Sequence, residues 1–264
     1  MVKLIALDLD GTLLDPSGAV TQATKEAIAQ ARKAGVRVVL NTGRPIPEAI
    51  HFSREAGCDE LISCLGGAAL VDGEDGQVLR RFDIREPSGM QALELCLNRE
   101  IELMIFAGNQ IVVDPFSKES LLRTYPFPAF HDNAVLTQDP MVYIREQGLP
   151  LTKIHGDWNP GRYPLEELAA LPGIQLTRSN DRDFELVAAG VDKGRMLSLL
   201  ALMYGIALDE CAAVGDSDND LAMLRVVGTP IAMGNASQSV KDTSCRMAPC
   251  NDEEGVAQAI LSCL

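Results

Sequence analysis

The chain has few basic residues for its size, and this shortage restricts what it can bind. Its 264 residues include 23 lysines and arginines against 37 aspartates and glutamates, which gives a formal net charge of −14. A protein that binds a nucleic-acid backbone needs a basic stripe, so we do not expect nucleic acid as a partner. A small phosphorylated metabolite remains a possible partner, because backbone N–H groups, a few cations and a bound metal can recognise one anion locally.

Long apolar runs and paired cysteines are also lacking. No apolar stretch approaches the roughly 18 to 20 residues that a membrane span needs, and the N-terminus has no secretory signal pattern. We therefore expect a cytoplasmic protein without a membrane partner. The seven cysteines are odd in number and form no Cys-x-x-Cys pair, so the sequence indicates neither a disulfide framework nor a zinc site. It leaves the oligomeric state open.

The first 83 residues alternate short apolar runs with helical patterns. Leu4–Leu7 is typical of a strand buried on both faces, and Thr21 of the N-cap of a helix that ends before Gly35. The apolar run Val36–Leu40 completes a strand-helix-strand unit, which predicts a parallel sheet. The elements expected next are a helix from 45–47, a strand at 61–64 and hairpin strands at 68–71 and 77–81.

The pattern changes at residue 84 and returns at residue 189. Residues 84–188 mix helices and strands, which predicts an inserted α+β domain, whereas 1–83 and 189–264 together predict one α/β core. In the insertion we expect helices at 88–99 and 164–171 and strands at 102–107, 110–113, 152–155 and 184–187. In the returning core we expect helices at 193–204, near 219–225 and from 253, and strands at 212–214 and 229–232. Residues 115–140 show no clean period.

The run Asp8-Leu9-Asp10-Gly11-Thr12 directly follows the first expected strand. Open α/β sheets bind their ligands at the carboxyl ends of strands. One carboxylate there can bind Mg²⁺ and attack, while the other passes a proton to a leaving oxygen. A lone Asp-x-Asp pair could equally be a solvated acidic turn. The apolar strand before the pair and the Gly-Thr after it favour a site.

Two further segments could recognise an anion. Asn41-Thr42-Gly43-Arg44 lies between a strand and a helix, where a hydroxyl and a helix N-terminus can bind phosphate. Lys193 begins a helix, where a cation is unfavourable with the helix dipole unless an anion lies close by. That anion could be Asp8 together with a phosphate. The alternatives are an ordinary turn for the first segment and a surface lysine for the second.

The segment Gly215-Asp216-Ser217-Asp218-Asn219-Asp220 has three aspartates within five residues. They repel one another unless a cation lies among them, so the segment predicts a Mg²⁺ site. A calcium-binding EF-hand loop would need a glutamate at its twelfth position. Counted from Asp216 that position is Val227, which rejects the EF-hand.

In order and spacing, these four segments resemble the four motifs of the haloacid dehalogenase-like superfamily, in particular its Cof-type sugar phosphatases. The resemblance spans the chain and includes 232–236 and 251–256. It implies a Rossmann-like parallel-sheet core with an inserted α+β cap domain that selects the substrate. It also implies a magnesium-dependent phosphatase that hydrolyses phosphate monoesters of small metabolites, sugar phosphates above all, through an aspartyl phosphate.

The resemblance also implies a role for each motif residue. Asp8 would be the nucleophile and a magnesium ligand, and Asp10 the acid/base and a ligand through its backbone carbonyl. Asp216 would complete the protein ligands, and Asp220 would hold Lys193 or a metal-bound water. Phosphate contacts would come from the Leu9 N–H, Thr42, Gly43, Arg44, Lys193 and Asn219.

The sequence departs from the Cof-type pattern after the third strand. That pattern has Asn-Gly-Ala, whereas this chain has Leu65-Gly66-Gly67-Ala68 and lacks the side-chain contact expected from the asparagine. Ser217 also replaces a common glycine. Alternative functions are a phosphomutase or phosphotransferase with the same intermediate, a receiver-like signalling domain, or a binding protein on the same scaffold. Chain length, the insertion and the paired Asp10 disfavour a receiver, and the intact motifs disfavour a binding protein.

Overall fold

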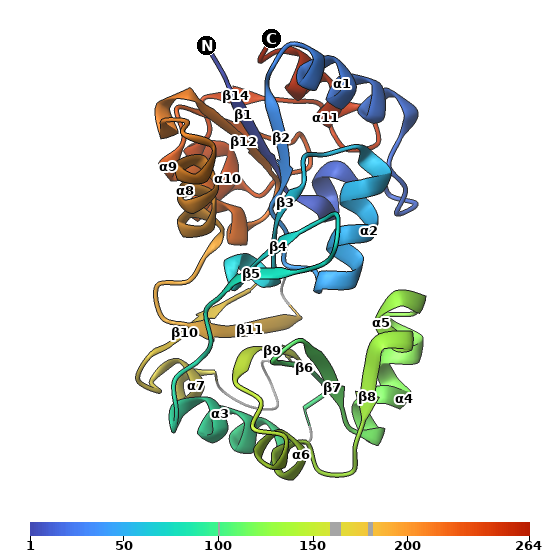
Figure 1. The fold of residues 1–264 in the computed structure, drawn as a ribbon, viewed down its shortest axis with the longest axis vertical. Coiled ribbons are helices and arrows are strands. Elements are labelled where there is room, and N and C mark those ends of the chain that lie inside the picture. Colours follow the sequence, from blue (N-terminus) through green and yellow to red (C-terminus); the bar gives the residue numbers. More distant parts are fainter. Residues whose placement is uncertain (100, 159–164, 179–181) are drawn as a thin grey trace. The chain divides into compact units, whose positions relative to one another are not determined.

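The structure is a computed structural model that describes residues 1–99, 101–158, 165–178 and 182–264, and the chain divides into two compact units (Figure 1). The core unit comprises residues 1–80 and 192–264, and the inserted unit comprises residues 81–191. The sequence placed the boundaries at 83 instead of 80 and at 188 instead of 191. Within the described part of the chain, no helix has both the length and the apolarity for crossing a membrane.

The core unit is built on a parallel five-stranded sheet. Its strands are β1 (Leu4–Leu7), β2 (Arg37–Leu40), β12 (Cys211–Gly215), β13 (Thr229–Ala232) and β14 (Arg246–Met247). They lie in the order β14-β13-β12-β1-β2. Every residue of β1 and β12 is buried, which explains why these strands are continuous apolar runs instead of alternating ones. The predicted parallel α/β core is confirmed.

Helices cover both faces of this sheet (Figure 1). One group is α1 (Gln22–Lys33), α2 (Ile46–Ala56) and α11 (Gly255–Leu261), and the other is α8 (Lys193–Tyr204), α9 (Leu221–Val226) and α10 (Gln238–Thr243). Thr21 caps α1 as predicted, since its side chain accepts a hydrogen bond from the Thr24 N–H. A separate sheet, in the order β3-β4-β5, contains β3 (Leu61–Cys64), β4 (Ala69–Asp72) and β5 (Val78–Arg81).

The register of the central strands determines where the site lies. Leu7, the last residue of β1, pairs in parallel with Leu40 of β2 and with Val214 of β12. The residues that follow these three strands therefore leave the sheet at the same edge. The first residues after these strands belong to three of the sequence motifs, and they are Asp8, Asn41 and Asp216.

The inserted unit has its own six-stranded sheet, in the order β10-β11-β9-β6-β7-β8. The pairs are antiparallel except β7 with β8. Apolar residues such as Leu93, Ile144 and Phe184 form a core between this sheet and its helices. The strands are β6 (Leu103–Ala107), β7 (Gln110–Val113), β8 (Ala134–Leu136), β9 (Leu151–Asp157), β10 (Ile174–Thr177) and β11 (Asp183–Ala188), and the helices α3 (Ser88–Leu97), α4 (Pro115–Thr124), α5 (Pro128–Asn133), α6 (Pro140–Glu146) and α7 (Glu166–Ala169).

The largest difference from the sequence prediction lies between residues 115 and 140. The structure forms α4, α5 and β8 there, where the sequence showed no clean period. The two helices are short, each begins with proline, and aromatic contacts of Phe130 with Tyr125 and His131 pack the segment. The prediction also missed α6, α10, β10 and β14. Of the helix predicted at 164–171, the structure describes α7, and residue 164 lies outside the described residues.

Candidate active site

A buried lysine joins two of the motifs at the carboxyl edge of the core sheet. Lys193 Nζ donates hydrogen bonds to Asp8 Oδ1 at 2.5 Å and to Asp220 Oδ1 at 2.7 Å. It also lies 3.1 Å from Asn219 Oδ1. Lys193 is 2% exposed and Asp8 is 4% exposed. The predicted proximity of Lys193 to Asp8 and Asp220 is therefore present, and Lys193 is not a surface lysine.

Two side chains hold the backbone around Lys193 in place. Asp192 caps helix α8, because its side chain accepts a hydrogen bond from the Arg195 N–H. The buried Asn41 side chain donates to the Lys193 carbonyl at 2.9 Å. Burial opposes the charged ammonium, but the carboxylates of Asp220 and Asp8 outweigh it and raise the pKa of Lys193 above its ordinary value. The ammonium thus stays protonated at neutral pH.

Asp216 approaches the turn after β1 closely. Thr12 Oγ1 donates to Asp216 Oδ1 at 3.1 Å, which links the first motif with the fourth. Gly11 has a φ of +76°, and a Cβ at this position would overlap the Asp216 carboxylate. Glycine is needed here both for the left-handed backbone and for the close approach. Asp220 Oδ2 accepts the N–H groups of Asp216 and Ser217, which holds the fourth motif in place.

The carboxylates of this site fit a divalent cation. Asp8, Asp216 and Asp220 each offer an oxygen within 4.8 Å of the other two, and the ammonium group of Lys193 contacts two of them, Asp8 and Asp220. Burial and then the Asp220 carboxylate raise the pKa of Asp8 well above its ordinary value, and the same causes raise the pKa of Asp216 to about 7. A bound cation would relieve this repulsion, and carboxylate oxygens are the donors that Mg²⁺ prefers.

The oxygens differ in whether they already accept hydrogen bonds. Both oxygens of Asp220 accept, one from Lys193 and the other from backbone N–H groups. Asp8 and Asp216 each use Oδ1 for such a contact, and among the described residues Oδ2 of each accepts none. Asp8 and Asp216 are therefore the better candidates to hold a metal, and Asp220 the better candidate to position Lys193.

Arg44, which the sequence suggested as a phosphate contact, pairs with two carboxylates in the structure. Its guanidinium donates to both carboxylate oxygens of Asp10, at 2.8 and 2.6 Å, and to Glu48 Oε2 at 2.6 Å. Sequence reasoning did not identify Glu48, which is 0% exposed. The available signal was the spacing of the two residues, because Glu48 lies in the first turn of α2, four residues after Arg44.

The remaining predicted contacts lie close to the same edge of the sheet. Leu9 follows Asp8 and begins the helical turn Leu9–Leu13. Thr42 is buried, and its hydroxyl oxygen accepts a hydrogen bond from the Arg44 N–H at 3.1 Å. Gly43 lies between these two residues, and Asn219 lies in the turn Asp218–Asp220 beside Lys193. The glycines after β3 form a turn in which Gly66 has a φ of +70°.

Two asparagines outside the four motifs support the turn after Asp8. Asn235 Nδ2 donates to the Gly11 carbonyl at 2.8 Å, and Asn251 Nδ2 donates to the Leu14 carbonyl at 2.8 Å. The Asn251 N–H in turn donates to Asn235 Oδ1. Both residues belong to the segments 232–236 and 251–256, which the resemblance had included without a structural reason.

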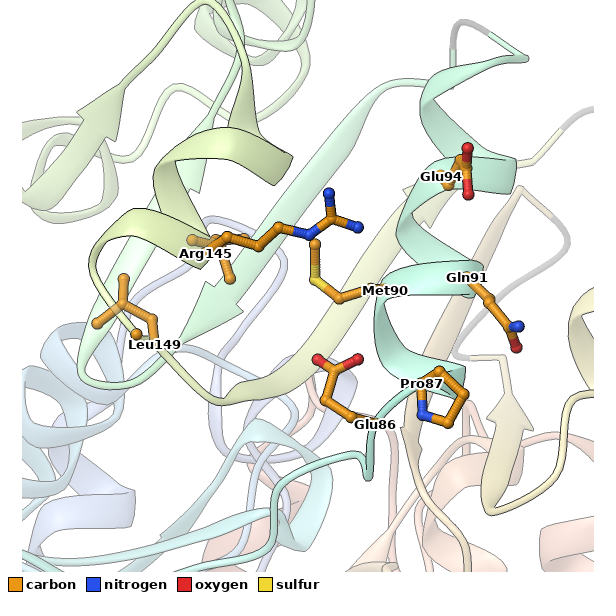
Figure 2. A pocket seen from close by; sticks show the side chains of 9 residues that line it. Glu86, Pro87, Met90, Gln91, Glu94, Arg145 and Leu149 are labelled. Carbon is orange, nitrogen blue, oxygen red and sulfur yellow. The ribbon is translucent and has the colours of Figure 1, made fainter.

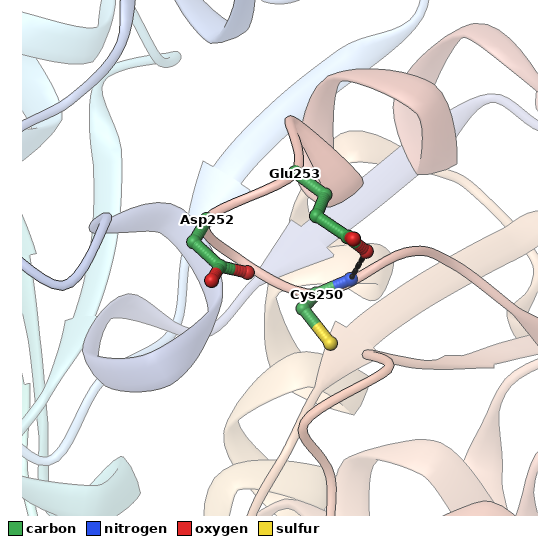
Figure 3. Close-up of side chains that lie close together, drawn as sticks. All are labelled: Cys250, Asp252 and Glu253. Atoms are coloured by element: carbon green, nitrogen blue, oxygen red, sulfur yellow. Dashed lines mark hydrogen bonds between the residues drawn. The ribbon is translucent and has the colours of Figure 1, made fainter.

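A cavity and a second cluster of side chains in the described part of the chain lack the groups found at Asp8. The inserted unit has a cavity of about 390 Å³, and Glu86, Met90 and Arg145 are among the residues that line it (Figure 2). Figure 3 shows Cys250, Asp252 and Glu253 close together, with the Cys250 N–H donating to Glu253. Asp252 and Glu253 are exposed. Neither place joins a buried lysine to several carboxylates at the carboxyl edge of the core sheet, so we place the candidate active site at Asp8.

Comparison with known proteins gives matches over the full chain. A model of the haloacid dehalogenase-like hydrolase family matches residues 5–260. Phosphatase YwpJ of Bacillus subtilis is 29% identical, over 97% of this chain and 98% of the relative. The 5-amino-6-(5-phospho-D-ribitylamino)uracil phosphatase YwtE of the same organism is 30% identical, over 98% and 97%. A solved haloacid dehalogenase-like hydrolase from B. subtilis has a TM-score of 0.86 at 26% identity and full coverage of both chains.

Proposed function

Because the chain belongs to the haloacid dehalogenase-like hydrolase family, we propose that it is a magnesium-dependent phosphatase whose nucleophile is Asp8. Its substrates are phosphate monoesters of small metabolites. The observation that carries the proposal is the buried contact of Lys193 with Asp8, because two further carboxylates, those of Asp216 and Asp220, lie beside Asp8. A purely structural ion pair would need only one carboxylate beside the lysine. Here several carboxylates lie close together, and Lys193 keeps a fixed positive charge next to Asp8.

The geometry supports a two-step reaction. Lys193 holds Asp8 Oδ1, which leaves Oδ2 to attack phosphorus. The Oδ2–P bond forms as the ester P–O bond breaks. Asp10, in its protonated form and with one of its two Arg44 contacts given up, passes its proton to the leaving oxygen. Asp10 then takes a proton from water, whose oxygen bonds to phosphorus while the Oδ2–P bond breaks. Inorganic phosphate leaves, and both carboxyl groups return to their starting states.

Cations and N–H groups make the approach of two anions possible. Asp8 and Asp216 would hold Mg²⁺ with the Asp10 carbonyl, and the bound ion would neutralise charge on the nucleophile and the phosphate. Lys193 supplies a fixed positive charge at the same place. The Leu9 N–H, Thr42, Gly43 and Asn219 would contact the phosphate oxygens.

We assign substrate selection to the inserted unit and sugar phosphates as the first class to test. One relative is named for a phosphate ester of a ribitylamino compound, which is a sugar-alcohol phosphate. Gly66 provides no side chain for the leaving group, so other groups must orient it. A panel of sugar, polyol, nucleotide and pyridoxal phosphates, assayed with and without Mg²⁺, identifies the ester.

The variant Asp8→Asn tests the nucleophile. Asparagine keeps the size of the side chain and an oxygen for Lys193, but it lacks the attacking carboxylate. Phosphate release with Mg²⁺ should fall by at least about a thousandfold, as when other catalytic nucleophiles are removed. Asp242→Asn, an exposed aspartate on α10, is the matched control and should keep normal activity. Normal activity of Asp8→Asn with an intact fold would refute the proposal, and product analysis with a sugar phosphate separates hydrolysis from phosphoryl transfer.

A further inference from the structure

We propose that Glu48 is a positioning residue for the proton transfer at Asp10, acting through Arg44. The inference rests on the proposed function, because it assumes that Asp10 exchanges protons with the leaving group and water. Glu48 lies outside the four motifs and does not touch Asp8 or Lys193 in the described contacts. Its contribution is to fix the direction of one guanidinium group.

Arg44 bridges Asp10 and Glu48 with separate N–H groups. Nε and Nη2 form a two-bond contact with the Asp10 carboxylate, and Nη1 donates to Glu48 Oε2. The guanidinium is planar and rigid, so fixing one edge of the group fixes the direction of the other. Asp10 is 53% exposed at its side chain, and Arg44 is 20% exposed. An exposed carboxylate can rotate freely unless a partner such as this one restrains it. When Asp10 carries its proton, one of the two hydrogen bonds is given up and the other still restrains the group.

The burial of Glu48 distinguishes this pair from an ordinary surface ion pair. Glu48 is 0% exposed, whereas the pair of Arg123 with Glu119, also four residues apart, has side chains that are 65% and 79% exposed. Exposed pairs of that kind hold neither side chain firmly. Burying a carboxylate costs free energy unless a cation pairs with it, so the buried Glu48 carboxylate favours its contact with Arg44. The third residue of α2 also suits an acid, because the helix dipole favours negative charge there.

A solely structural role would have a different consequence for the reaction. If Glu48 only attached α2 to the preceding loop, its loss would affect all substrates alike. If Glu48 positions the proton donor, its loss matters most where the leaving oxygen needs a proton. An alkoxide is a poor leaving group and needs that proton, whereas p-nitrophenolate leaves readily without it. The ratio of kcat/KM values for an alkyl and an aryl phosphate therefore separates the two roles.

The test compares Glu48→Ala with wild type on p-nitrophenyl phosphate and an alkyl phosphate such as a sugar phosphate, both with Mg²⁺. General acid catalysis is worth about 10² to 10⁴ in rate, so a misdirected Asp10 should lower kcat/KM for the alkyl ester by about 30-fold. For the aryl ester, kcat/KM should fall by less than about threefold. Glu48→Gln, which keeps an accepting oxygen, should show a smaller selective loss. Glu55→Ala, a partly exposed glutamate of α2 that pairs with Lys25, should leave both values unchanged.

Equal losses on the two esters, or no loss, would overturn the positioning role. If Glu48→Ala does not fold, Arg44→Lys takes its place, because one ammonium group cannot bridge both carboxylates. A selective loss on the alkyl ester in that variant supports the role, and a uniform loss overturns it. Failure of the function itself looks different: wild type would then release no phosphate from either ester, or Asp8→Asn would stay active.

Discussion

Without Mg²⁺, the core unit should become less stable as the pH rises from 6 to 8. Burial and the Asp220 carboxylate raise the pKa of Asp216 to about 7, compared with an ordinary 3.8. The folded chain therefore binds this proton more tightly than the unfolded chain. Stability from this group falls as the pH rises through the window between the two values, and the fall levels off above pH 7.

The magnitude follows from the titration curve. For a folded pKa of about 7, raising the pH from 6 to 8 lowers the contribution of Asp216 to the free energy of unfolding by about 1.4 kcal/mol. Because Asp216 is only partly buried, solvent screening reduces this to about 1 kcal/mol. In a protein of this size, that corresponds to a fall in Tm of about 2 to 4 °C.

Thermal melts at pH 6 and pH 8, with a chelator and with saturating Mg²⁺, measure the effect. Mg²⁺ should raise the Tm more at pH 8, because binding at 100 times Kd stabilises the fold by about 2.7 kcal/mol and needs ionised carboxylates. Asp216→Asn is the control, and its melts without Mg²⁺ should depend less on pH. A wild-type Tm that does not fall from pH 6 to 8 without metal would refute the reasoning, as would an equal fall in Asp216→Asn.

Two further substitutions test the packing of the site. Lys193→Met removes the ammonium that contacts both Asp8 and Asp220, so phosphate release should fall by more than about 100-fold. Chemical denaturation at neutral pH should show that the free energy of unfolding falls by about 3 to 5 kcal/mol. A variant as stable as wild type would contradict the burial argument. Gly11 has a φ of +76°, and Gly11→Ala adds a Cβ that overlaps Asp216. The free energy of unfolding should fall by about 1 to 3 kcal/mol, and much of the activity should be lost. Gly18→Ala, also at positive φ but with open space around it, should cost stability without the loss of activity.

The elements of the core could be predicted closely where local signals agree. The predicted bounds of the strands at 4–7, 61–64 and 229–232 and of the helix at 193–204 match the structure. In each case a short apolar run or a capped helical pattern is bounded by residues that end it. Residues 115–140 could not be predicted, because short helices there depend on aromatic packing among residues such as Phe130, which no local period records.

The sequence by itself determined that Asp8, Asn41 and Asp216 gather at one edge of the sheet. Motifs that follow parallel strands must emerge at one edge of the sheet, so the order of strands and helices was sufficient. Only the tertiary structure decided which partner each side chain takes. Arg44 contacts Asp10 and Glu48, and Asn235 supports Gly11. Such contacts depend on the directions of side chains from elements far apart in the chain, and packing determines those directions once the whole core has formed.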